Sequence, residues 1–144
     1  MSTYKIKTVD KTNISMDDKI WDIADVAEVN CYQWDETGYK PDTKARVLKG
    51  TDGLYVRIET DEYPLVGNYK NYNDMVCCDS CMEFFLNAAP SKTNNYMNFE
   101  INVLGTLYTG FGENRETSRP IVIDYEKMGI ETVKLEKGWK LKYL

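Results

Sequence analysis

The chain has 144 residues, with 18 Lys and Arg against 23 Asp and Glu, no histidine, and a formal net charge of −5. This length fits one domain, which we expect to span residues 1–144, and an apolar content of 42% excludes a wholly disordered chain. The acidic balance disfavours nucleic acid as a partner, and the absence of histidine excludes Ser-His and Cys-His nucleophile pairs and the commonest zinc ligand.

The sequence also predicts where the protein resides. It has no stretch of about 20 apolar residues to span a bilayer, and residues 1–7 lack the apolar region of a signal peptide. The cysteines are Cys31, Cys77, Cys78 and Cys81, and an adjacent pair is poorly suited to a framework of long-range disulfides. We therefore expect a cytoplasmic protein with reduced thiols and no membrane association.

Alternation of apolar and polar residues dominates the chain and predicts short β-strands. Residues 53–60 alternate cleanly, and the glycines within residues 49–53 predict a hairpin with residues 44–48. The predicted strands, in chain order, are residues 4–9, 26–32, 44–48, 53–60, 81–86, 96–103, 106–111, 120–124, 131–135 and 139–143. With no convincing long amphipathic helix, the fold class is all-β, an antiparallel β-sandwich of the immunoglobulin or jelly-roll kind.

Two polar segments interrupt the strands. Residues 61–80 are long for a loop and carry Tyr69 and Tyr72 among several asparagines, and long ordered loops on a rigid scaffold often carry function. Residues 112–119 are polar and predicted to lie on the surface.

The strand at residues 81–86 places Glu83 on the face opposite Met82, Phe84 and Leu86. If it pairs with residues 96–103, Glu83 shares a face with Asn98, Glu100 and Asn102, and a third strand would add Arg57, with Tyr55 and Glu59 beside it. Carboxylates, amides and a guanidinium suit sugar hydroxyls, and aromatic rings cover the apolar faces of pyranoses. A merely solvated sheet face is the alternative interpretation.

The run Asp79-Ser80-Cys81-Met82-Glu83-Phe84-Phe85-Leu86, followed by Tyr96-x-Asn98-Phe99-Glu100-Ile101-Asn102 and Gly105-Thr106, resembles the family 9 carbohydrate-binding modules and their wider relatives. Trp21-x-x-Ala24, Thr43-x-Ala45-Arg46-Val47-Leu48 and Gly53-Leu54-Tyr55-Val56 resemble the opening of that family. The resemblance extends from about residue 14 to the C-terminus.

The resemblance implies a β-sandwich that binds plant polysaccharide ends or small oligosaccharides, as an accessory to glycoside hydrolases. In it, Glu83 matches a glutamate that hydrogen-bonds sugar hydroxyls, whereas Glu100 stands where sugar-binding members can carry a basic residue. The resemblance implies no cofactor, although it leaves calcium open.

The sequence departs from this family in two respects. Residues 75–78 lack the tryptophan that precedes the D-S pair in established binders, and the chain ends near the opening of a strand that continues in the family. We expect such a shortened sandwich to form a homodimer through an exposed edge strand or to be part of a longer polypeptide. Tyr69 and Tyr72 are candidates to replace the missing ring, Trp34 in a polar turn-like stretch is a candidate for an exposed stacking ring, and Trp21 is predicted to be a core residue.

Metal or redox chemistry, catalysis and protein association are the alternatives to saccharide binding. Cys78-Asp79-Ser80-Cys81 has C-x-x-C spacing, but it precedes a strand, and without histidine a zinc site would need distant Cys31 or a carboxylate. Catalysis by Glu83 and Glu100 would require one raised pKa and a suitable separation. The sequence therefore predicts non-catalytic saccharide binding with no metal site. The alternative is a degenerate sandwich that mediates protein association.

Overall fold

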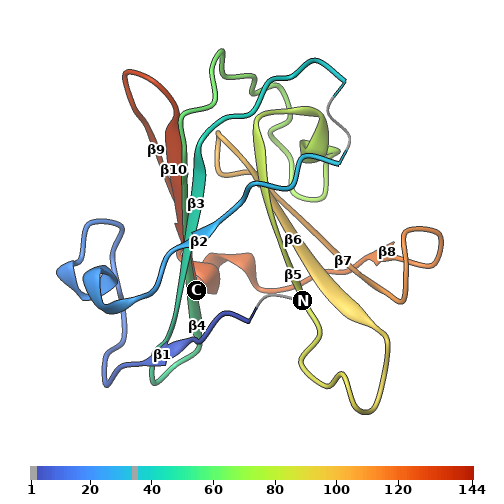
Figure 1. Cartoon of the computed structure of the whole chain (residues 1–144). Coiled ribbons are helices and arrows are strands. Elements are labelled where there is room, and N and C mark those ends of the chain that lie inside the picture. Colours follow the sequence, from blue (N-terminus) through green and yellow to red (C-terminus); the bar gives the residue numbers. More distant parts are fainter. Residues whose placement is uncertain (1–2, 34–35) are drawn as a thin grey trace. The chain divides into compact units, whose positions relative to one another are not determined.

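The computed structural model describes residues 3–33 and 36–144 of the chain (Figure 1). These residues form ten β-strands and three short 3-10 helices. They divide into two compact units: unit 1 contains residues 1–64 and 127–144, and unit 2 contains residues 65–126. No helix within the described ranges is long and apolar enough to cross a bilayer.

Unit 1 contains one sheet in the strand order β1-β3-β4-β10-β9, with β2 also paired to β3. Its strands are β1 (Lys7–Thr8), β2 (Ala27–Glu28), β3 (Thr43–Lys49), β4 (Leu54–Thr60), β9 (Glu131–Lys134) and β10 (Trp139–Tyr143). The predicted hairpin is present, since β3 and β4 are antiparallel neighbours and the Gly50 amide donates to the Gly53 carbonyl at 2.9 Å. The C-terminal strand β10 pairs with β4 along Val56–Thr60.

The N-terminal segment packs on this sheet and includes the 3-10 helix η1 (Lys19–Ile23). Trp21 is only 1% exposed, donates from Nε1 to the Ser15 carbonyl at 2.9 Å, and belongs to a buried cluster with Ile14, Leu48 and Tyr55. The prediction that Trp21 is a core residue is therefore confirmed.

Unit 2 contains a second sheet in the order β5-β6-β7-β8, and every pair in it is antiparallel. The strands are β5 (Cys81–Leu86), β6 (Tyr96–Asn102), β7 (Leu107–Gly112) and β8 (Arg119–Pro120). The 3-10 helices η2 (Val76–Cys78) and η3 (Tyr125–Met128) lie before β5 and after β8 in the chain.

The all-β prediction is confirmed, and each predicted strand contains or overlaps an observed one. Three predicted strands shrink to two residues each, at β1, β2 and β8. The residues of β1 and β8 are exposed, so these strands have no buried side chains that would stabilise a longer pairing. Pro120 in β8 also has no amide hydrogen to donate to a neighbouring strand. One pairing differs from an all-antiparallel sheet, because β1 runs parallel to β3.

The expectation that Tyr55, Arg57 and Glu59 extend the face of Glu83 is wrong. These residues lie on β4, in the sheet of unit 1, whereas β7 is the strand that adjoins β6 in unit 2. Alternation predicts which residues of a strand share a face, but it does not specify which strands are neighbours. Here β4 has its two sides occupied by β3 and β10.

Gly138, at the turn between β9 and β10, should not tolerate a side chain. Its φ is +89°, and an added Cβ would lie 1.9 Å from the Thr60 carbonyl oxygen. We expect Gly138→Ala to lower the free energy of unfolding by about 2 kcal/mol or more, as measured by urea denaturation. Gly38→Ala is the matched control, because Gly38 has a φ of +79° but nothing within 4 Å of the added Cβ. Equal losses in both variants would contradict a steric cause.

Candidate functional site

One face of the unit 2 sheet gathers the polar groups predicted around Glu83, and we call it the carboxylate face. Glu83 on β5 is the register partner of Glu100 on β6, and Glu100 is in turn the partner of Tyr108 on β7. Residues directly opposite in an antiparallel pair project to the same side. Period two then adds to the carboxylate face Cys81, Phe85, Tyr96, Asn98, Asn102 and Gly110.

Glu83 and Glu100 are two like charges held on neighbouring strands. Partial burial raises the pKa of both carboxyls, and the charge of Glu100 raises that of Glu83 further. Asn98 donates from Nδ2 to Glu100 Oε1 at 2.6 Å. This bond and the charge of the Arg115 guanidinium lower the pKa of Glu100 and partly offset the effect of burial. The raised values mean that this pair favours folding at low pH and loses that contribution as the pH rises through the folded-state pKa values.

Three further ionisable groups lie within electrostatic reach of the two carboxylates. Burial is the largest cause of the raised pKa of Cys77, Cys81 and Tyr108. The negative charge of Glu100 raises the pKa of each of these groups further. Cys77 belongs to η2, which therefore lies near β5 and β6 at the carboxylate face. These thiols and the phenol stay protonated at neutral pH and contribute no negative charge of their own.

Two glycines on β7 allow a loop to approach the carboxylate face. An added Cβ at Gly112 would lie 2.5 Å from Ser118 Cα, and one at Gly110 would lie 2.8 Å from Ser118 Oγ. Thr117 and Ser118 therefore lie directly against the sheet, and the same loop, residues 113–118, carries Arg115, whose charge lowers the pKa of both Glu83 and Glu100. The sequence predicted this segment only as surface, although glycines two residues apart on one strand necessarily share a face.

Asp79 organises the long loop that precedes β5. Its Oδ1 accepts from the Asn68 amide at 2.9 Å, and its Oδ2 accepts from the Tyr69 amide at 3.0 Å and from Asn102 Nδ2 at 2.8 Å. Burial alone would raise the pKa of Asp79, but these bonds outweigh it and hold the pKa below its ordinary value. Next to it, Ser80 Oγ accepts from the Val66 amide at 2.9 Å. The D-S pair therefore anchors the loop.

The structure places the predicted site residue Asn102 inside this anchor. Its side chain is 0% exposed, its Nδ2 donates to Tyr69 and Asp79, and its Oδ1 accepts from the Leu104 and Thr106 amides. Asn102 shares the carboxylate face by register, as predicted, yet it has no exposed surface to contact a ligand directly. Tyr69 is partly exposed, and its backbone is held by the same bonds.

Two other predicted residues, Arg57 and Tyr72, do not lie on the carboxylate face. The side chain of Arg57 is 16% exposed in unit 1, where it donates to Glu59 Oε2 at 3.1 Å and lies 5.8 Å from the Trp21 ring. The Tyr72 hydroxyl bonds to Thr109, whose side chain projects from the opposite face of the unit 2 sheet. Trp34 lies outside the described residues.

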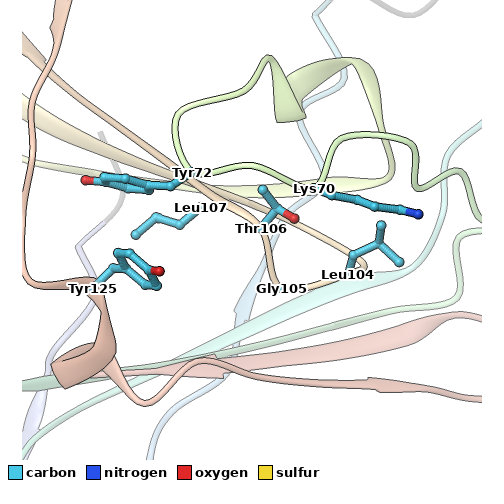
Figure 2. A pocket seen from close by; sticks show the side chains of 7 residues that line it. All are labelled: Lys70, Tyr72, Leu104, Gly105, Thr106, Leu107 and Tyr125. Atoms are coloured by element: carbon cyan, nitrogen blue, oxygen red, sulfur yellow. The ribbon is translucent and has the colours of Figure 1, made fainter.

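Tyr72 instead lines a separate cavity of about 220 Å³ in unit 2 (Figure 2). Its ring centroid is 4.9 Å from that of Tyr125, and the other lining residues are Lys70, Leu104, Gly105, Thr106 and Leu107. Figure 2 shows Tyr72, Leu107 and Tyr125 toward one end of this group and Lys70 and Leu104 toward the other. The Tyr72 hydroxyl also donates to the Ile121 carbonyl at 3.0 Å and accepts from the Ile123 amide at 3.1 Å, so these bonds fix its polar end.

Thiols, carboxylates and imidazoles are the side chains that most often hold metal ions in proteins. Within residues 3–33 and 36–144, no three His, Cys, Asp or Glu residues are grouped so as to hold an ion.

Comparisons with known proteins identify the family of the chain. The family model described as carbohydrate-binding family 9 matches residues 11–135. The chain belongs to carbohydrate-binding family 9. No curated protein matches the sequence.

Several solved structures share the fold of this family 9 chain. A candidate carbohydrate-binding protein of Bacteroides uniformis ATCC 8492 is similar with a TM-score of 0.72 at 20% identity, over 96% of this chain and 69% of that one. A family 9 module of Caldicellulosiruptor kristjanssonii in complex with cellotriose gives 0.67 at 14% identity, over 96% and 65% of the two chains. A family 9 module of the same organism in complex with glucose gives 0.64 at 14% identity, over 95% and 66%. These likenesses confirm the predicted β-sandwich fold class.

Replacing the Asp79 carboxylate should cost stability in a pH-dependent manner. We expect Asp79→Asn to lower the free energy of unfolding at pH 7 by about 2 kcal/mol, because a neutral amide oxygen replaces a charged acceptor of several N–H groups. Since the folded-state pKa is depressed, the contribution is complete above the unfolded value of about 4 and is lost as the pH falls through the folded value. Denaturant titrations from pH 7 downward should therefore converge for wild type and variant.

Asp17→Asn provides the control for this experiment, because Asp17 is exposed. Asp17→Asn should change the free energy of unfolding little, both at pH 7 and at lower pH. A loss in Asp79→Asn that stays constant down to the lowest pH would contradict the role of the ionised carboxylate.

Gly112→Ala should displace the loop that carries Arg115. The added methyl group would meet the Ser118 backbone, and such overpacking costs about 1–3 kcal/mol. With Arg115 moved away, the pKa values of Glu83 and Glu100 should rise further, which NMR titration of their side-chain carboxyls measures. Arg115→Ala should raise both pKa values without the same loss of stability. Unchanged pKa values in both variants would refute the electrostatic role of Arg115.

Proposed function

We propose that this family 9 chain binds a saccharide without catalysis, at the carboxylate face, with Glu83 as its central hydrogen-bonding group. The observation that carries the proposal is the register pairing of Glu83 with Glu100 on this face. Within the described part of the chain, Glu83 is exposed and accepts no hydrogen bond, so its oxygens are available to hydroxyl donors. Membership of a carbohydrate-binding family supports the choice of ligand.

The neighbouring groups suit a sugar hydroxyl network. Asn98 fixes Glu100 Oε1 through its own Nδ2, so Glu100 presents a pre-oriented carboxylate beside Glu83. The Tyr108 phenol lies on the same face opposite Glu100, and Arg115 offers a donor among these acceptors. Solved family 9 modules in complex with cellotriose and with glucose favour glucose-based ligands as the first to test.

Membership of a carbohydrate-binding family favours binding over catalysis. A hydrolytic pair needs two groups whose environments separate their pKa values, so that one acts as acid while the other stays ionised. Burial raises the pKa of both Glu83 and Glu100, so the expectation of no catalysis rests on membership of a carbohydrate-binding family and not on these pKa values. We therefore expect no release of reducing sugar from xylan or cellulose oligosaccharides.

The central role of Glu83 can be tested by calorimetric titration with glucose, cellotriose and xylose-based oligosaccharides. We expect saturable binding by the wild type and at least about tenfold weaker binding by Glu83→Gln, since a hydrogen bond to a charged acceptor contributes about 1.5–3 kcal/mol. Glutamine keeps the shape of the glutamate side chain, so a loss of affinity in Glu83→Gln is due to the missing carboxylate.

Glu126→Gln is the matched control, because Glu126 is an exposed glutamate of unit 2 on η3, away from the carboxylate face in sequence and register. It removes the same charge and should leave the affinity unchanged. Full affinity in Glu83→Gln, or no heat with any of these sugars, would refute the proposed function. In the second case a protein-association scaffold becomes the better account.

A further inference from the structure

The carboxylate face continues past Glu83 into a pair of aromatic rings that the sequence did not single out. Phe85 is 52% exposed, and its ring centroid lies 5.5 Å from that of Tyr96 at an interplanar angle of 54°. Phe85 is the register partner of Asn98, so Tyr96, two residues before Asn98 on β6, is its diagonal neighbour on the same face. Such tilted pairs are attractive and hold both rings in place.

The position of these rings relative to Glu83 is set by the strand. Phe85 follows Glu83 by two residues on β5, which places its Cα about 6–7 Å further along the same face. This separation is of the order of one pyranose ring. On β7 the register partners of Tyr96 and Asn98 are Gly112 and Gly110, so β7 contributes no side chain beside the aromatic pair.

The combination has the chemistry of a saccharide surface. A pyranose presents hydroxyls at its edge and apolar C–H groups on its faces, so one unit bonded to carboxylates places the next over an apolar ring. An exposed phenylalanine two residues from an exposed carboxylate offers both contacts in sequence along one strand. Phe111, exposed by 42%, is a useful contrast because it lies on the opposite face of the same sheet.

We propose that Phe85 and Tyr96 form a second sugar subsite, which extends the site at Glu83 and Glu100 along β5 and makes oligosaccharides the preferred ligands over monosaccharides. The inference rests on the proposed function, because the first sugar unit must occupy the carboxylates. One unit hydrogen-bonds to Glu83, and the next stacks on the exposed ring of Phe85.

The test compares glucose with cellotriose as ligands of the full chain by calorimetry. The wild type should bind cellotriose about 3- to 10-fold more tightly than glucose, the range expected from one ring contact. Phe85→Ala should abolish this preference while its glucose affinity stays within about twofold of the wild type. Phe85→Tyr should retain the preference, and Phe111→Ala should behave as the wild type.

The outcomes separate the two proposals. Equal affinity of the wild type for both sugars, or an unchanged preference in Phe85→Ala, would overturn the second subsite and leave the site at Glu83 intact. Absence of binding to either sugar would overturn both. Thermal unfolding verifies that the variants are folded, and Phe85→Leu, which keeps an apolar side chain without the ring, decides the question if Phe85→Ala is unstable.

Discussion

The hydrogen bond of 2.8 Å between Asn102 and Asp79 joins the last residue of β6 to the segment just before β5. Because these strands are antiparallel, a fixed point at this end sets the register along their whole length. A slip of one residue would move Glu83 and Glu100 to opposite faces. The same carboxylate accepts the backbone amides of Asn68 and Tyr69, so loop and register are fixed together. The geometry of the carboxylate face depends on this bond.

A second constraint is the balance of charge on that face. Two carboxylates on neighbouring strands repel each other, and burial adds to the cost of their ionised forms. The molecule offsets this through Asn98, which donates to Glu100, and through Arg115. Arg115 reaches the pair because Gly112 lets its loop approach the sheet backbone. A pair that is supported in this way retains acceptor oxygens for a ligand.

The candidate site was partly predictable from the sequence. Period-two alternation correctly placed Glu83, Asn98, Glu100 and Asn102 on one face, because their two strands are consecutive and form a hairpin. It did not predict that Asn102 would be enclosed, since its amide donates to Tyr69 and Asp79 of the distant loop and also accepts from the turn that follows it. Phe85 lies between Phe84 and Leu86, and this apolar run did not indicate an exposed ring. The pleat of the strand nevertheless turns Phe85 toward the solvent.

The sequence by itself determined the all-β class, the positions of the long strands, the core role of Trp21 and the shared face of Glu83 and Glu100, because each follows from local periodicity or from pairing of consecutive strands. Only the tertiary structure decided that β4 lies beside β10, which removes Arg57 from the face of Glu83, and that the loop of Arg115 folds over β7. The physical reason is that strand order and loop approach depend on contacts between residues far apart in the chain, and these are decided by the total packing and hydrogen bonding of the fold.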